Sequence, residues 1–106
     1  MSELFVILTS CPAAAADGIA THLVEGQFAA CVSALPGALS TYRWNGEVQR
    51  DQETLLLIKV REPALDACIA ALEAVHPYEV PEIVALPAAR VNASYLAWAR
   101  QMVPGV

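Results

Sequence analysis

The sequence has 106 residues, of which 57% are hydrophobic and 16% are charged, and its formal net charge is -5. This length suits one core, so we expect residues 1–106 to form a single domain. The acidic balance, without any run of Lys or Arg, gives little support to a phosphate-tracking nucleic-acid surface, and the three cysteines lack the spacing of a disulfide framework or a structural zinc cage.

The first predicted elements are a strand and a helix. Leu4–Leu8 is an apolar run of strand length that stops at Thr9. The run is too short for a membrane span and no basic lead-in precedes it, so it predicts a cytoplasmic protein without membrane contact. Pro12 suits the first turn of a helix, and apolar residues then recur at helical spacing as far as Phe28.

The range 31–61 predicts two long strands joined by a tight turn. Asn45-Gly46 is the residue pair preferred in a two-residue type I′ hairpin turn. Counting outward from this turn places Pro36 opposite Leu55, and Pro36-Gly37 is expected to bend or bulge its strand.

The remaining sequence predicts a helix, a strand and a terminal helix. The first of these helices begins at Glu62-Pro63, has an apolar stripe that runs to Val75, and ends near His76 because a proline follows. Residues 83–86 then read as a strand, and Asn92 is a suitable cap for the last helix.

This order of elements predicts an α+β fold of the ferredoxin-like type, βαββαβ plus a C-terminal helix. Right-handed crossovers place the first two helices on the same face of a four-stranded antiparallel sheet, which includes the long β-hairpin. The second face of the sheet is left without helices from the βαβ units.

The second face nevertheless carries apolar side chains. Leu56, Ile58 and Val60 share one face of their strand, whereas Leu55 and Leu57 share the other. The far half of the hairpin is also an unsupported ribbon, which is marginal by itself. Both features predict a closed homo-oligomer. The alternative is that the terminal helix alone covers the second face.

Four segments together resemble the CutA divalent-cation tolerance family, in the family's order and spacing. They are AACVSALPGALSTYRWNGEV, LLLIKVRE, HPYEVPEIVALP and NASYLAWA. The resemblance implies a homotrimer with clefts between its subunits, similar in architecture to the PII signalling proteins. It also implies a role in tolerance of, or response to, copper and other divalent ions.

In some bacterial members of the family, copper is thought to be bound by a cysteine at the end of the first strand and by a His-His pair before Pro-Tyr. The corresponding positions in this sequence are Leu8, Val75 and His76, so only the second histidine is present. The resemblance therefore implies a protein that requires no cofactor, with Cu or Zn as candidate ligands.

The candidate metal ligands are His76, Glu79 and Glu82, which offer one nitrogen and two carboxylates between prolines. They could hold a divalent ion if they converge. The alternative, which we favour for tight binding, is that His76 finishes its helix while the glutamates remain solvated.

Three further residues are candidate binding residues. Lys59 interrupts an apolar strand, where it either forms a structural ion pair with Glu82 or binds an anionic ligand in a cleft between subunits. Tyr42 and Trp44 share one face of the ribbon, where they form an aromatic ligand wall or anchor a neighbouring subunit.

Enzyme motifs are absent: the sequence contains no G-x-S-x-G, Walker loop or H-E-x-x-H. We therefore predict a non-catalytic trimer that binds or buffers divalent cations. The alternative is a PII-like sensor or scaffold whose clefts bind a small anionic ligand and which engages an unknown protein partner.

Overall fold

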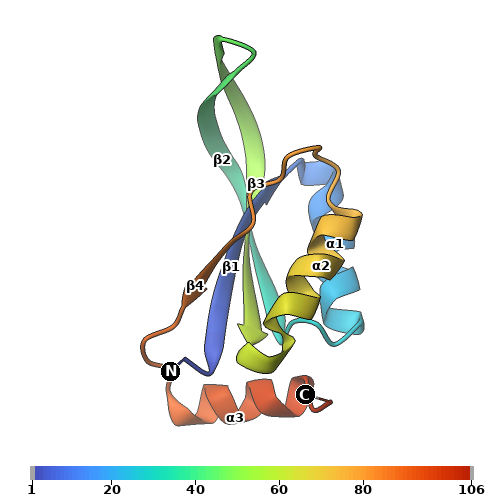
Figure 1. Cartoon of the computed structure of the whole chain (residues 1–106), viewed down its shortest axis with the longest axis vertical. Helices are drawn as coiled ribbons and strands as arrows, with labels where there is room; N and C mark the ends of the chain where they lie inside the picture. Colours follow the sequence, from blue (N-terminus) through green and yellow to red (C-terminus); the bar gives the residue numbers. More distant parts are fainter. Residues whose placement is uncertain (1, 106) are drawn as a thin grey trace.

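Residues 2–105, which the computed structural model describes, form a four-stranded antiparallel sheet with helices packed against it (Figure 1). In chain order the elements are β1 Leu4–Cys11, α1 Ala13–Glu25, β2 Cys31–Trp44, β3 Glu47–Arg61, a 3-10 turn at Glu62–Ala64, α2 Leu65–Val75, β4 Val84–Pro87 and α3 Ala93–Met102. The strand order is β2-β3-β1-β4, and each neighbouring pair is antiparallel. The predicted ferredoxin-like α+β fold is confirmed.

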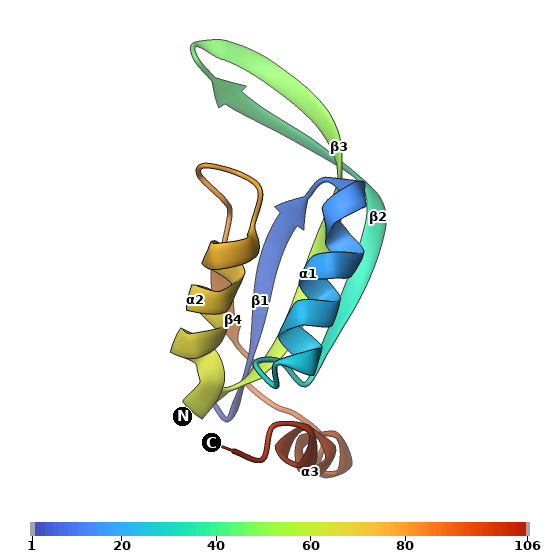
Figure 2. The ribbon, with the colours of Figure 1, turned by 90° about the vertical axis from the view of Figure 1, so that its right-hand side faces the viewer.

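The core lies between the sheet and the two helices α1 and α2, which cover the same face (Figure 2). Ile7 of β1 pairs with Ile58 of β3, and both side chains are fully buried. Because side chains alternate along a strand, every second residue of these two strands points into this layer. The helices supply the opposite wall of the core with Ile19, Leu23, Cys68 and Leu72.

The hairpin turn forms at Asn45 and Gly46, as predicted, and both residues have the positive φ that a type I′ turn requires, 50° and 80°. The predicted bulge at Pro36-Gly37 is also confirmed, since the register shifts between Leu35 and Ala38. Leu35, not Pro36, faces Leu55. The predicted pairing was wrong by one residue because the bulge adds one residue to β2.

Four predicted boundaries differ from the structure. α1 ends at Glu25, before Phe28, because Gly26 caps the helix and Gln27 has a positive φ of 60°. β1 continues three residues beyond Leu8, because β3 offers pairing partners as far as Thr54. β4 is Val84–Pro87, shifted by one residue, and the helical segment predicted from Glu62 begins with a 3-10 turn. Val75, predicted on the buried stripe of α2, is 38% exposed in the last turn of that helix.

The terminal helix α3 lies across one end of the sheet (Figure 1). Its Ala99 is fully buried, and Arg61 Nη1 of β3 donates a hydrogen bond to the Val103 carbonyl at 2.7 Å. Asn92 is the N-cap residue, but its side chain bonds Ser94 Oγ instead of a backbone N–H. The alternative in which this helix covers the whole second face is not what the structure shows, because Leu35 remains 48% exposed.

The outer half of the β2-β3 hairpin projects beyond the rest of the molecule as a two-stranded ribbon, and the molecule is 45 Å long as a result (Figure 1). We call residues 38–53 the ribbon. Figure 2 shows the ribbon bending toward the side of the molecule that carries α2 and β4. This bend brings it above the connection between α2 and β4.

Candidate functional site

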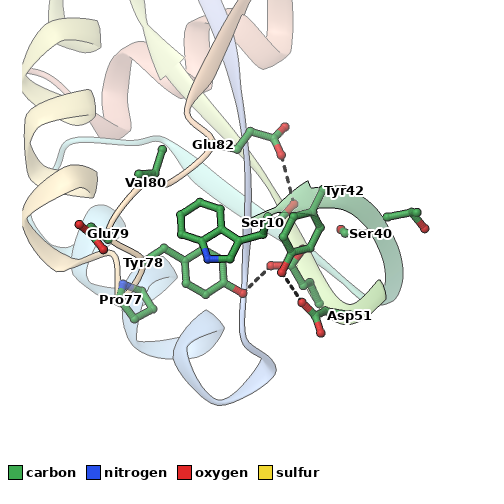
Figure 3. A pocket seen from close by; sticks show the side chains of 12 residues that line it. Ser10, Ser40, Tyr42, Asp51, Pro77, Tyr78, Glu79, Val80 and Glu82 are labelled. Atoms are coloured by element: carbon green, nitrogen blue, oxygen red, sulfur yellow. Dashed lines mark hydrogen bonds between the residues drawn. The ribbon is translucent and has the colours of Figure 1, made fainter. Parts of the chain in front are cut away.

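A cavity of about 730 Å³ lies between the ribbon and the connection from α2 to β4 (Figure 3). This volume falls in the range of small-molecule sites. The residues that line it are Ser10, Ser40, Thr41, Tyr42, Trp44, Asp51, Glu53, Pro77, Tyr78, Glu79, Val80 and Glu82.

One wall of the cavity comes from the ribbon. Tyr42 pairs with Gln49, so Tyr42, Trp44 and Asp51 occupy positions of the same face. The Tyr42 hydroxyl donates a hydrogen bond to Asp51, which lies diagonally across the strand pair. Glu53 lies at the base of the ribbon, beside the bulge, and it is only 8% exposed.

The opposite wall is the connection between α2 and β4, and His76 fastens this segment to β1. The backbone N–H of Tyr78 donates to His76 Nδ1 at 3.2 Å. Because this nitrogen accepts, the proton of the neutral ring is on Nε2, which donates to the Ser10 carbonyl at 3.0 Å. The ring is 8% exposed. These two bonds set the direction in which Tyr78 and the residues after it leave the helix.

The two walls meet through a hydrogen bond from Tyr78 to Glu53, at 2.5 Å between the hydroxyl and Oε2. Figure 3 shows Tyr78 and Tyr42 extending from opposite walls into the space between them. Ser10 Oγ also donates to Glu82 Oε1 at 3.4 Å. The cavity is therefore bounded by aromatic rings and by carboxylates.

The charged side chains that line the cavity are all acidic. Asp51, Glu53, Glu79 and Glu82 are acidic, and no lining residue is basic. The hydrogen bond to Asp51 is the main cause that raises the pKa of Tyr42. Desolvation, and then the hydrogen bond to Glu53, raise the pKa of Tyr78. An anionic ligand would be repelled here, so the alternative of an anion site gains no support.

The predicted metal ligands do not form a metal site by themselves. Glu79 and Glu82 line the cavity, whereas His76 does not, and both of its ring nitrogens are engaged in hydrogen bonds. Within residues 2–105 no group of three or more His, Cys, Asp or Glu side chains is arranged to hold a metal ion. The prediction of a site built from these three residues is not confirmed.

Lys59 lies on the second face of the sheet and is not among the cavity residues. Its Nζ donates to Ser33 Oγ at 2.7 Å and to the Leu57 carbonyl at 3.4 Å. The predicted ion pair with Glu82 is wrong, because Glu82 hydrogen-bonds Ser10 instead. Lys59 finds its partners on its own strand and the neighbouring one.

Sequence reasoning placed Tyr42 and Trp44 on the same face, where it favoured an anchor for a neighbouring subunit over a ligand wall. The structure puts both residues in the cavity lining, and both readings stay predictions. Sequence reasoning missed Glu53 and Tyr78. Neither residue gave a recognisable sequence signal, because Tyr78 lies in the proline-flanked segment and Glu53 lies in a polar stretch that is typical of solvent-exposed chain. The hairpin register could have indicated Asp51, because diagonal positions on one face are neighbours.

A comparison with protein families shows to which family the chain is related. Residues 5–102 match the family described as CutA1 divalent ion tolerance protein. The chain belongs to the CutA family. This match covers nearly the whole length and confirms the resemblance seen in the four sequence segments.

Individual CutA proteins agree with this assignment. The divalent-cation tolerance protein CutA of Thermus thermophilus is 48% identical over 99 residues, which are 93% of this chain and 96% of the relative. The chain spans only 59% and 51% of the CutA proteins it matches in Xenopus laevis and Homo sapiens. Of these three relatives, the Thermus thermophilus protein is the one whose name states a role in divalent-cation tolerance.

Solved CutA structures have the same fold. CutA from Xylella fastidiosa superposes with a TM-score of 0.93 at 40% identity, covering 96% of this chain and 99% of that one. CutA from Archaeoglobus fulgidus, described as periplasmic, has a TM-score of 0.89 at 29% identity and covers 94% and 98%. Because a relative carries that description, the cytoplasmic location of this CutA chain stays a prediction.

Among the described residues, no helix has both the length and the apolar character needed to span a membrane.

Proposed function

We propose that this chain is a non-catalytic protein of divalent-cation tolerance that responds to copper and acts as a homotrimer. The observation that carries the proposal is the 48% identity, over 93% of the chain, to a protein named for divalent-cation tolerance. Membership in the family supplies the general role, and the acidic cavity supplies a chemical reason for it. Carboxylate oxygens are ligands for divalent cations, and none of the lining residues is basic.

The proposed contact with Cu²⁺ or Zn²⁺ is at Glu79 and Glu82, which line the cavity from the connection between α2 and β4. His76 is left out of this contact because its two nitrogens already hold the connection in place. Two carboxylates are few for tight binding, so a neighbouring subunit supplies the further ligands.

The trimer is supported by the edges and the second face of the sheet. β2 and β4 are the two edge strands, and both carry exposed apolar side chains, with Leu39 at 65% and Leu86 at 46% exposure. Unpaired apolar edges favour association with further strands. Head-to-tail contact between a β2 edge and a β4 edge generates a ring when the rotation closes, and the family resemblance implies three subunits.

Complementation tests the role. A bacterial strain that lacks its own CutA protein is grown on a copper series with this chain, with the double variant Glu79→Gln and Glu82→Gln, or with an empty plasmid. We expect growth at higher copper with the wild-type chain than with either of the others. Equal growth with the wild-type chain and the empty plasmid refutes the role in tolerance.

Light scattering tests the assembly. At micromolar concentration we expect a mass three times the 11.3 kDa of one chain. A single-chain mass at that concentration refutes the trimer, and the double variant is the control that separates assembly from metal contact.

A further inference from the structure

Glu53 is an acidic side chain for which residues 2–105 provide no ion-pair partner. Its exposure is 8%, yet in the part of the chain that the structure describes the one ion pair is between Arg100 and Glu3. A carboxylate this deeply buried is rarely left without a cation, because losing hydration is costly. The hydroxyl of Tyr78 supplies a hydrogen bond to Oε2 but no charge.

A cation has space beside this carboxylate. Glu53 lines the cavity, whose volume of about 730 Å³ far exceeds what a single metal ion occupies. In residues 2–105 the acidic side chains are also not gathered into a group of three that could ligate one ion. A single divalent cation in contact with Glu79 and Glu82 therefore leaves most of the cavity, including the surroundings of Glu53, unfilled.

The composition of the walls indicates which cation fits. Tyr42, Trp44 and Tyr78 give the cavity aromatic surface, which attracts organic ammonium groups as well as alkyl chains. Asp51 and Glu53 lie on the ribbon, whereas Glu79 and Glu82 lie on the opposite wall. Carboxylates on two separate walls match a molecule whose positive groups are separated by an apolar linker.

We propose that the cavity binds an aliphatic diamine or polyamine. One ammonium group pairs with Glu53 at the base of the ribbon, and a second is attracted by the carboxylates of the opposite wall. The alkyl linker lies against the rings of Tyr42 and Trp44. This proposal does not depend on metal tolerance, because it rests on the buried carboxylate and on the aromatic walls.

Calorimetry and thermal shift on the full chain test the proposal, with putrescine and spermidine as probes. The neutral control is 1,4-butanediol, and magnesium chloride at equal ionic strength is the inorganic control. We expect heat and a raised Tm with the two amines and neither effect with the diol. We expect the affinity to weaken as sodium chloride is raised, because both partners are charged.

Glu53→Gln is the decisive variant, since glutamine still accepts the Tyr78 hydroxyl while the charge is removed. We expect its Kd for spermidine to rise by about tenfold or more, the usual effect of losing a hydrogen bond to a charged group. The matched control is Glu25→Gln, which removes the same charge at the exposed end of α1. We expect its Kd to stay within about twofold of the wild-type value.

Several results overturn the proposal. They are no binding at millimolar amine, equal binding of the diol, equal stabilisation by magnesium, or equal losses in the two glutamate variants. A structure of the assembled protein with a neighbour's Lys or Arg on Glu53 overturns it as well. Failure of copper complementation with intact amine binding refutes the proposed tolerance role and leaves the amine site standing.

Discussion

Replacing His76 with alanine separates a structural histidine from a metal ligand. The ring connects two segments, donating from Nε2 to the Ser10 carbonyl at 3.0 Å and accepting at Nδ1 from the Tyr78 N–H at 3.2 Å. It also lies against the Tyr78 ring, with 5.0 Å between centroids. His76→Ala removes both hydrogen bonds and a side chain that is 8% exposed.

The magnitude follows from these contacts. Two hydrogen bonds at about 1 kcal/mol each give a loss near 2 kcal/mol in the free energy of unfolding, before the lost ring packing is counted. For a domain of this size 1 kcal/mol changes Tm by roughly 4–8 °C, so we expect Tm to fall by about 8–16 °C. Scanning calorimetry at fixed protomer concentration measures this change, because assembly makes Tm depend on concentration.

Two conservative variants separate the contributions of the two His76 hydrogen bonds to stability. His76→Asn offers an acceptor near the Nδ1 position, and His76→Gln offers a donor near the Nε2 position, so we expect each to lose about half as much as alanine. His22→Ala, on the exposed side of α1, is the control and should change Tm little. Copper titration of His76→Ala should give the wild-type heat per folded protein. Loss of the copper heat without loss of stability would refute the structural role.

The other predictions concern the core, the turn and pH. Leu72→Ala empties a fully buried position of α2 and should lower the free energy of unfolding by about 2–5 kcal/mol in chemical denaturation. Gly46→Ala should cost about 1–2 kcal/mol, because φ is +80° although no atom lies within 4 Å of the added Cβ. Burial raises the pKa of the Cys68 thiol from 9.0 to about 11, so the folded state holds this proton more tightly. The protonated thiol therefore contributes its full share to the free energy of unfolding below pH 9, and this share is lost as pH rises from 9 to 11. Thermal melts across that range will measure the loss.

Each of these predictions has a control. For the core it is Val24→Ala, since Val24 is 42% exposed on α1, and an equal loss at both positions would contradict the assignment of the core. For the turn, Gly18→Ala places the same methyl group where the backbone has no positive φ. For pH, the Tm of Cys68→Ala should decline less steeply than that of the wild-type chain between pH 9 and 11. An identical slope would contradict the role of this thiol.

Local sequence signals were sufficient for the elements and the fold class. Asn45-Gly46 specified its turn because few residue pairs accept two successive positive φ angles. Pro77 ended α2 because the residue before a proline is disfavoured in the helical conformation. The order of strands and helices then favoured the ferredoxin-like sheet over other topologies, because βαβ crossovers are right-handed. The observed strand order β2-β3-β1-β4 agrees with that prediction.

The site was predicted less well, because its members come from distant parts of the chain. Tyr42 and Trp44 could be placed on one face from the hairpin period alone. Lys59 was assigned to Glu82 by sequence logic, but the fold supplies Ser33 as its partner. Glu53 was overlooked because a glutamate in a polar stretch reads as solvated.

The sequence by itself determined where the chain turns, which residues alternate into the core and which family the chain belongs to, because these depend on short-range geometry and on local residue order. Tertiary structure alone decided that the ribbon bends over the connection between α2 and β4 and buries Glu53 against Tyr78. Sixty-six residues of chain separate His76 from Ser10, and no local propensity encodes a contact over that separation. Burial and the hydrogen bonds that accompany it are properties of the folded chain, so the charge and shape of the cavity follow only from packing.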